Sequence, residues 1–263
     1  MENRIGSIVW NELQTKEVEL MKNFHQNLFG YLWHDVPIDE KLFYHIGMQD
    51  EAPALAIVQL PPFIANAGGQ SFNIYYIATN NLTAQKEKAV SLGARVIVDE
   101  VMMENVGRWS IILDPFGAAF CLIEMQERPT SMGKNQAGHY WWHEVIAKDA
   151  KASALFYGQL FDWKIEEVQT GENLYYIAKN TQNNEDIRIG FYPMDERLKA
   201  ANMNDFWLGF VYCDNVDELC QKAQNNGATI LLDPHDDDII GCKAWLLQPD
   251  NSILGVVSPK IVE

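Results

Sequence analysis

The chain has 263 residues, of which 48% are hydrophobic and 21% are charged, and its formal net charge is −16. This composition predicts packed cores and not disorder. An acidic surface repels phosphate backbones and anionic lipids, which argues against nucleic acid and membranes as partners. The sequence has no long apolar run, no signal-peptide pattern and no CxxC spacing among its four cysteines. We therefore expect a cytoplasmic protein with reduced thiols.

The first half of the sequence recurs in the second half. The motif WNEL at Trp10 returns as WHEV at Trp142, at an offset of 142 − 10 = 132 residues. The same offset relates four further aromatic or apolar pairs: Phe24 and Phe156, Leu28 and Leu160, Phe29 and Phe161, and Tyr31 and Trp163. Gly93-Ala94 and Pro115 recur at an offset of 134. The repeat predicts two domains, 1–126 and 139–263, joined by a polar linker over 127–138.

In the first half, the order strand, helix and three strands occurs twice. Alternating apolar and polar residues predict strands over 6–14, 31–33, 42–48, 54–60, 72–78, 95–98, 109–113 and 118–123. Helical spacing predicts a helix after the cap residue Thr15, ending at Gly30, and a second helix over 82–92. Asp114-Pro115-Phe116-Gly117 has the residues of a tight turn between the last two strands.

The second half repeats this order. Strands are predicted over 140–147, 164–168, 174–178, 187–192, 206–212, 229–232, 244–247 and 253–257. Asp149 is the predicted N-cap of a helix whose buried stripe contains Ala152, Leu155, Phe156 and Leu160, and a second helix covers 216–226. His235-Asp236-Asp237-Asp238 is interpreted as an acidic surface loop between strands, since it lacks the glycine and distal glutamate of a calcium loop. The sequence thus predicts four strand-helix-strand-strand-strand units of an α+β fold.

Three segments carry a resemblance to a known family: IVWNELQTKEVELMKNFHQNLFGY, GRWSIILDPFGAAFCLIE and WWHEVIAKDAKASALFYGQLFDW. They resemble the vicinal oxygen chelate superfamily, the group of glyoxalases, bleomycin-resistance proteins and extradiol dioxygenases, and especially its tandem glyoxalase-like members. The resemblance implies four βαβββ modules paired into two glyoxalase-like domains. Each domain would be a curved mixed sheet around a concave pocket, with helices outside.

The resemblance also implies where a metal would bind. Enzymes of this superfamily typically hold a divalent metal with a His, a His or Gln, and a Glu, and use it to chelate two neighbouring substrate oxygens. Carried over residue by residue, these positions fall on Trp10 and Trp142, near Asn73 and Trp207, and on Cys121 and Gly255. Neither half keeps the three ligands there. We therefore expect no cofactor and no metal at these positions, while a divalent metal held by other residues stays open.

Strand alternation turns Trp10 and Glu12 to one side, and Trp142 and Glu144 likewise. Aromatic walls with a few polar groups suit a small-molecule pocket. The predicted ligand-binding residues are Trp10, Glu12, Asn73, Tyr75, Trp109, Cys121, Trp142, Glu144 and Trp207. Alternatively, the tryptophans fill the core and Cys121 is a small buried hydrophobe.

The candidates for catalysis are Glu12, Glu144 and His143. The glutamates could be buried bases, or carboxylates that hydrogen-bond to the backbone or to tyrosine. His143 could instead pack toward the helix as a satisfied histidine.

Three functions follow from these observations. The first is a protein of the glyoxalase and bleomycin-resistance type that binds a small molecule in an aromatic-lined cup without the usual metal. The second is a metal-dependent lyase, isomerase or dioxygenase with a non-standard site. The third is a non-catalytic interaction protein whose cups are filled by its own side chains. Both a monomer and a homodimer are compatible with the sequence.

Overall fold

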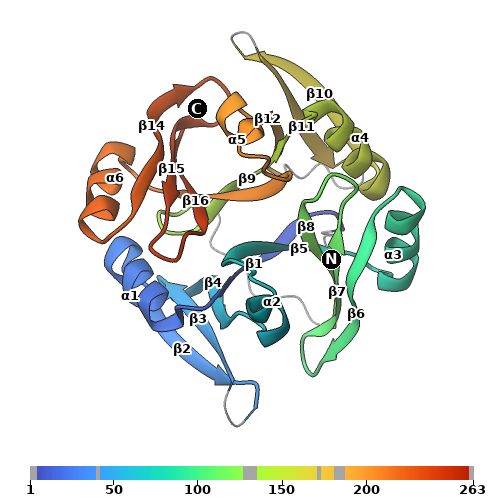
Figure 1. The fold of residues 1–263 in the computed structure, drawn as a ribbon, viewed down its shortest axis with the longest axis horizontal. Helices are drawn as coiled ribbons and strands as arrows, with labels where there is room; N and C mark the ends of the chain where they lie inside the picture. The colour runs from blue at the N-terminus through green and yellow to red at the C-terminus, as the bar shows by residue number, and fades with distance from the viewer. Residues whose placement is uncertain (1–4, 40–41, 127–134, 171–172, 181–186, 261–263) are drawn as a thin grey trace. The chain divides into compact units, whose positions relative to one another are not determined.

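The computed structural model describes residues 5–39, 42–126, 135–170, 173–180 and 187–260 (Figure 1). Most of the predicted linker, residues 127–134, lies outside this range. Within it, no helix is both long enough and apolar enough to cross a membrane. The four cysteines are free thiols, as the sequence predicts.

The order of the elements confirms the predicted α+β fold of four βαβββ modules. The first half contains β1 (Ile8–Thr15), α1 (Val18–Phe29), β2 (Leu32–Pro37), β3 (Phe43–Gln49), β4 (Ala52–Gln59), α2 (Pro62–Asn66), β5 (Phe72–Ala78), α3 (Leu82–Ser91), β6 (Arg95–Met103), β7 (Gly107–Leu113) and β8 (Ala119–Met125). The second half contains β9 (Tyr140–Ala147), α4 (Ala150–Phe161), β10 (Trp163–Thr170), β11 (Asn173–Asn180), β12 (Ile189–Pro193), α5 (Glu196–Ala200), β13 (Phe206–Tyr212), α6 (Val216–Asn225), β14 (Thr229–Asp237), β15 (Gly241–Leu247) and β16 (Ile253–Pro259). The short helices α2 and α5 were not predicted.

The strands form two eight-stranded mixed sheets, one from each half of the sequence. Their orders are β2-β3-β4-β1-β5-β8-β7-β6 and β10-β11-β12-β9-β13-β16-β15-β14. The first strand of a module pairs in parallel with its fourth strand, as in β1 with β4 and β9 with β12, and the remaining pairs within a module are antiparallel. The two halves therefore share one topology, as their sequence repeat predicts.

Each module covers one face of its own strands with a helix (Figure 1). Helix α1 packs on β4, α3 on β6 to β8, α4 on β10 to β12, and α6 on β14 to β16. Gly30 ends α1 with a left-handed φ of 82°, and its N–H donates to the Gln26 carbonyl over 2.9 Å, as predicted. Asp149 caps α4, where its side chain accepts from the Ala152 N–H, as predicted.

The chain folds into two compact units, and each unit is discontinuous in sequence. Unit 1 consists of Met1–Trp10, Tyr75–Pro129 and His143–Trp207, and unit 2 of Asn11–Ile74, Thr130–Trp142 and Leu208–Glu263. Each unit combines most of one module of the first half with most of one module of the second. The domain boundaries proposed above follow the halves of the sequence and stay a prediction.

Two predictions about helix ends and faces are wrong. Thr15 does not cap α1: it ends β1, its hydroxyl lies 3.0 Å from the Ser71 hydroxyl, and the helix begins after Glu17. Leu155 is not part of the buried stripe of α4, since 49% of its side chain is exposed. The buried face of α4 contains Ala154 and Tyr157 instead.

The acidic segment at 235–238 is not a loop throughout. Strand β14 continues to Asp237, which pairs with Gly241 of β15. The Asp237 carboxylate lies 2.9 Å from the ammonium of Lys243, a buried residue. This ion pair explains why an aspartate lies at the end of the strand. The spacing of residues in the sequence does not reveal the pair.

Candidate functional site

Each half of the chain joins a carboxylate of its first strand to a phenol of a neighbouring hairpin. The Tyr44 hydroxyl on β3 donates to Glu12 Oε2 over 2.7 Å, and the Tyr175 hydroxyl on β11 donates to Glu144 Oε1 over 3.0 Å. Gln14 also donates to Glu12, over 2.9 Å. Only 4% of Glu12 and 0% of Glu144 is exposed. These contacts agree with the interpretation of both glutamates as hydrogen-bonded carboxylates, whereas a role as bases stays a prediction.

The two halves differ in how far their aromatic side chains are exposed. Three residues of the first half are half-buried: Trp10, Tyr44 and Trp109. Their counterparts in the repeat are almost fully buried, with 5%, 1% and 0% exposed: Trp142, Tyr175 and Lys243. The first half therefore offers more accessible aromatic surface on these strands than the second.

The pairing of strands shows which predicted residues share a face. Tyr76 pairs with Cys121, and Trp109 pairs with Ile123 two residues further along the same strand. Because side chains of paired residues point to the same side and alternate along a strand, Cys121 and Trp109 share one face of this sheet. Tyr75, next to Tyr76, lies on the opposite face.

The predicted residues on that opposite face make specific contacts. The Asn73 amide donates to the Ile253 carbonyl over 2.9 Å. Within unit 1, the Tyr75 ring lies edge-on to His143, with 5.0 Å between ring centroids, and 6.3 Å from Trp207. Burial lowers the pKa of His143 to about 3, so its ring is neutral at ordinary pH. His143 is therefore a buried, neutral ring against Tyr75 of β5, and its packing toward the helix stays a prediction.

Sequence reasoning missed a buried cation in the second half. Lys243 on β15 is 0% exposed, and its ammonium lies 2.9 Å from Asp237 and 5.7 Å from the centroid of the Phe210 ring. Phe210 in turn packs over Gly255, where an added Cβ would come within 2.5 Å of the Phe210 ring. The only sequence signal was that Lys243 stands where the repeat has Trp109.

Comparisons with known proteins agree with this architecture. Residues 138–240 match the family model described as the Glyoxalase/Bleomycin resistance protein/Dioxygenase superfamily. Proteins of Mycobacterium tuberculosis (strain CDC 1551 / Oshkosh) and Mycobacterium bovis (strain ATCC BAA-935 / AF2122/97), each named "Putative glyoxylase CFP32", are 26% identical to this chain over 262 residues, which cover 98% of it and 97% of theirs. The chain is thus similar to the glyoxalase/dioxygenase superfamily, in sequence over residues 138–240 and in fold over nearly its whole length.

Solved structures of superfamily members share the fold over nearly the whole chain. The Mn(II)-bound glyoxalase from Novosphingobium aromaticivorans has a TM-score of 0.64 at 11% identity, covering 97% of this chain and 82% of that one. The 2,2',3-trihydroxybiphenyl 1,2-dioxygenase from Sphingomonas wittichii strain RW1 also has a TM-score of 0.64, at 14% identity, covering 98% of this chain and 93% of that one. At these identities the likeness shows the fold alone.

The residues at the positions where superfamily enzymes hold a metal do not fit one. Indole rings occupy the first position in both halves, at Trp10 and Trp142, and an indole N–H is only a hydrogen-bond donor. The second position is taken by Asn73, whose amide is bonded to a carbonyl, and by Trp207, whose indole N–H donates to the Tyr157 hydroxyl over 2.9 Å. The third falls on buried Cys121 and on Gly255. Among the described residues, no group of three or more His, Cys, Asp or Glu side chains is placed to hold a metal ion.

Two cavities in the described part of the chain lie elsewhere. One has a volume of about 490 Å³ and is lined by Gly30, Leu32, His34, Met48, Gln49, Asp50 and Glu51. The other has a volume of about 170 Å³ and is lined by Lys151, Leu155, Ile165, Glu167 and Tyr176. Neither is lined by any of the residues predicted to bind a ligand.

Proposed function

We propose that this protein binds a small organic molecule through the first half of the chain, without a metal at the positions used by superfamily enzymes. The observation that carries the proposal is the difference in exposure between the halves. Trp10 and Tyr44 are half-buried, whereas Trp142 and Tyr175 are buried. A ligand needs accessible aromatic surface beside fixed polar groups, and the first half combines the two.

The chemistry of the Glu12 and Tyr44 pair indicates what it would recognise. Because Tyr44 directs its proton to Glu12, its phenolic oxygen can meet a ligand hydroxyl only as a hydrogen-bond acceptor. Gln14 donates to the other carboxylate oxygen and holds it in place. The half-buried ring of Tyr44 itself adds an apolar surface. A small aromatic or amphipathic molecule that carries hydroxyl groups suits this arrangement.

The names of relatives support the same class of ligand. Solved structures of similar fold include a catechol dioxygenase and a glyoxalase, and they suggest catechol as a first probe. A metal-dependent lyase, isomerase or dioxygenase remains the alternative function, and it requires a bound metal held by residues other than those at the usual positions. For the second half we propose a structural role, which the burial of Trp142, Glu144 and Lys243 supports.

Catechol is a suitable probe because it is a small ring with two neighbouring hydroxyl groups. Calorimetric titration should detect binding to the unmodified chain, and Tyr44→Phe should weaken it about tenfold, since a hydrogen bond in a partly buried site is lost. The matched variant Tyr175→Phe should bind catechol as the unmodified chain does. If Tyr175→Phe weakens binding and Tyr44→Phe does not, the assignment to the first half is wrong.

A further inference from the structure

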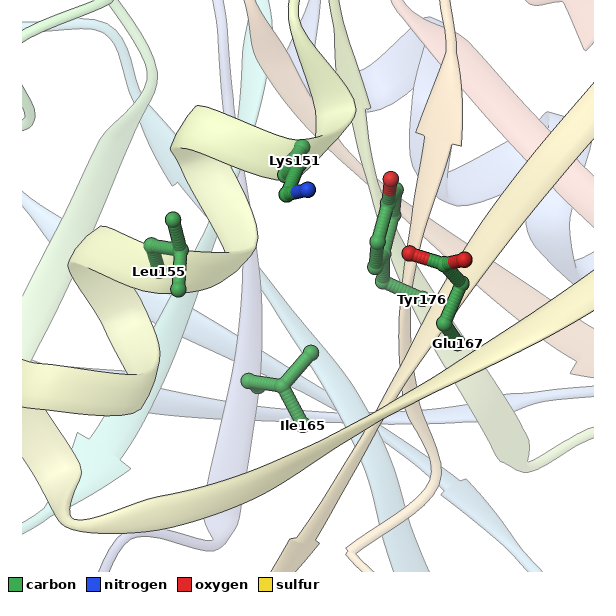
Figure 2. A pocket seen from close by; sticks show the side chains of 5 residues that line it. All are labelled: Lys151, Leu155, Ile165, Glu167 and Tyr176. Atoms are coloured by element: carbon green, nitrogen blue, oxygen red, sulfur yellow. The ribbon is translucent and has the colours of Figure 1, made fainter.

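A cavity of about 170 Å³ opens between helix α4 and strands β10 and β11 (Figure 2). Leu155 and Ile165 supply apolar surface from the helix and the strand. Figure 2 shows Glu167 and Tyr176 close together on one side and Lys151 projecting from the helix. All five lining residues belong to one module within unit 1, on the face that α4 covers.

The cavity belongs to the third module, which contains β9 to β12. In the first module, which contains β1 to β4, side chains of the protein fill the corresponding place. The repeat relates Ile165 to Trp33 (165 − 33 = 132) and Ala154 to Lys22 (154 − 22 = 132). The Trp33 indole N–H donates to the Lys22 carbonyl over 3.1 Å, so this ring lies between α1 and β2. The Lys22 ammonium lies 3.2 Å from the Asp35 carboxylate and 3.3 Å from His45 Nδ1. An indole and an ammonium thus occupy the space that is open in the third module.

The acceptor groups recur in the third module. Lys22 has no lysine counterpart there, since the repeat places Ala154 at its position, and the cation that lines the cavity is Lys151. Glu167 stands where the first module has Asp35 (167 − 35 = 132), and Tyr176 stands at the position of His45 after a shift of one residue (176 − 45 = 131). Burial raises the pKa of Tyr176, and the negative charges of Glu167 and Asp149 act in the same direction. A hydrogen bond from the Tyr176 hydroxyl to Glu167 raises this pKa further, so the two groups that would receive an ammonium lie together.

The residue on the neighbouring strand that pairs with this position also differs between the two modules. In the first module Trp33 pairs with Gly47, where an added Cβ would lie 3.1 Å from the indole. In the third module Ile165 pairs with Ala178, which carries that Cβ. The third module thus has isoleucine in place of the indole and alanine in place of the glycine that gives the indole room. Leu155, which is 49% exposed, borders the open space.

We propose that this cavity binds a small primary ammonium compound with an apolar body of about one ring. The ammonium would take the place that Lys22 has in the first module, between the Glu167 carboxylate and the Tyr176 hydroxyl. The apolar body would lie over Ile165 and Leu155, where the first module has its indole. A cavity of roughly 150 Å³ accommodates benzene, so the volume suits a single ring. Lys151 also lines the cavity and its positive charge opposes that of the ligand, so a second positive charge on the ligand would be disfavoured further.

Benzylamine and benzyl alcohol are matched probes, since they share the ring and differ in charge. We expect benzylamine to shift the backbone amide NMR signals around Ile165, Glu167 and Tyr176, and to bind about tenfold more tightly than benzyl alcohol. Glu167→Gln should remove this preference. Glu166→Gln is the control, because Glu166 points to the other side of β10 and pairs with Lys164 and Lys179.

A variant that restores the first-module pair should close the cavity. Ile165→Trp combined with Ala178→Gly rebuilds the Trp33 and Gly47 arrangement, and it should abolish benzylamine shifts while the thermal unfolding transition is kept. The proposal is overturned if benzylamine and benzyl alcohol shift the same signals equally, if neither shifts them, or if the closed variant binds benzylamine as well as the unmodified chain. Because Glu167→Gln changes only an exposed side chain, its result is informative even if the double variant does not fold.

Discussion

The Tyr157 phenol in α4 donates a hydrogen bond to the Asp114 carboxylate, 3.1 Å away, in the turn between β7 and β8. The other Asp114 oxygen accepts from the backbone N–H groups of Phe116 and Ala118, over 2.9 and 2.8 Å. Burial raises the pKa of Asp114 to about 6, although these hydrogen bonds act against the shift. Ionisation of Asp114, in the turn that the sequence predicts from Asp-Pro-Phe-Gly, therefore costs free energy in the folded chain.

Asp114→Asn should flatten the pH dependence of stability. The folded-state pKa lies above the unfolded value of 3.8, so the folded chain binds more protons between these values and stability falls as pH rises toward 6. We expect the unfolding free energy of the unmodified chain, relative to the variant, to drop by about 2 kcal/mol between about pH 4.5 and about pH 7. Urea unfolding at both pH values measures this difference, and a constant difference would contradict it.

His25 should act in the opposite direction. Burial lowers its pKa to about 4, despite the opposing effects of Asp250 and Gln248, so the folded chain keeps the ring neutral while the unfolded chain takes up a proton near 6.5. Stability from this group is present above 6.5 and is lost as pH falls through about 4. Between about pH 7 and about pH 5, the unfolding free energy of His25→Phe should fall by about 2 kcal/mol less than that of the unmodified chain.

The two glutamate and tyrosine pairs should differ in their effect on stability. Tyr175→Phe removes a donor from the fully buried Glu144 carboxylate and should cost about 1–3 kcal/mol of unfolding free energy. Tyr44→Phe should cost less than about 1 kcal/mol, because water can reach the half-buried Tyr44 site. Equal losses in chemical unfolding would show that the exposure difference has no energetic consequence.

Gly190→Ala should disturb the same buried pair from the backbone side. Gly190 pairs with Glu144 across β12 and β9, and an added Cβ would overlap the Tyr175 hydroxyl. Since Tyr175 is 1% exposed and cannot move into solvent, we expect a loss of about 2–4 kcal/mol. In the first half Ala56 already has a Cβ at the matching position beside Glu12, so Ala56→Gly is the control. A Gly190→Ala loss no larger than that of the control would refute the steric reason.

The repeat and the alternation of residues were sufficient to predict the fold. Gly30 and Asp149 act at their helix ends as predicted because each interaction is local, between residues within four positions of one another. Thr15 and Leu155 were predicted wrongly because their surroundings are not local. The Thr15 hydroxyl accepts from the Glu17 N–H, but it also lies beside Ser71, 56 residues away. The buried Tyr157 of α4 donates to Asp114, 43 residues away.

The contacts of the site were harder to predict than its strands. Sequence spacing showed that Glu12 and Glu144 share a position, but the donors Tyr44 and Tyr175 lie 32 and 31 residues further on, in another hairpin. The buried Lys243 was not expected because a lysine in an alternating strand normally reaches solvent. The cavity beside Ile165 became apparent only when the packing of two related modules could be compared.

The central claim is that the Glu12 and Tyr44 side of the first half binds a small hydroxylated molecule without a metal. The most direct measurement is a catechol titration of the same preparation before and after treatment with EDTA, followed by calorimetry. We predict one dissociation constant for both samples, because Tyr44 and Glu12 supply the contacts. Loss of binding after EDTA treatment, with recovery on adding Fe(II) or Mn(II), would contradict the claim and favour a metal-dependent enzyme.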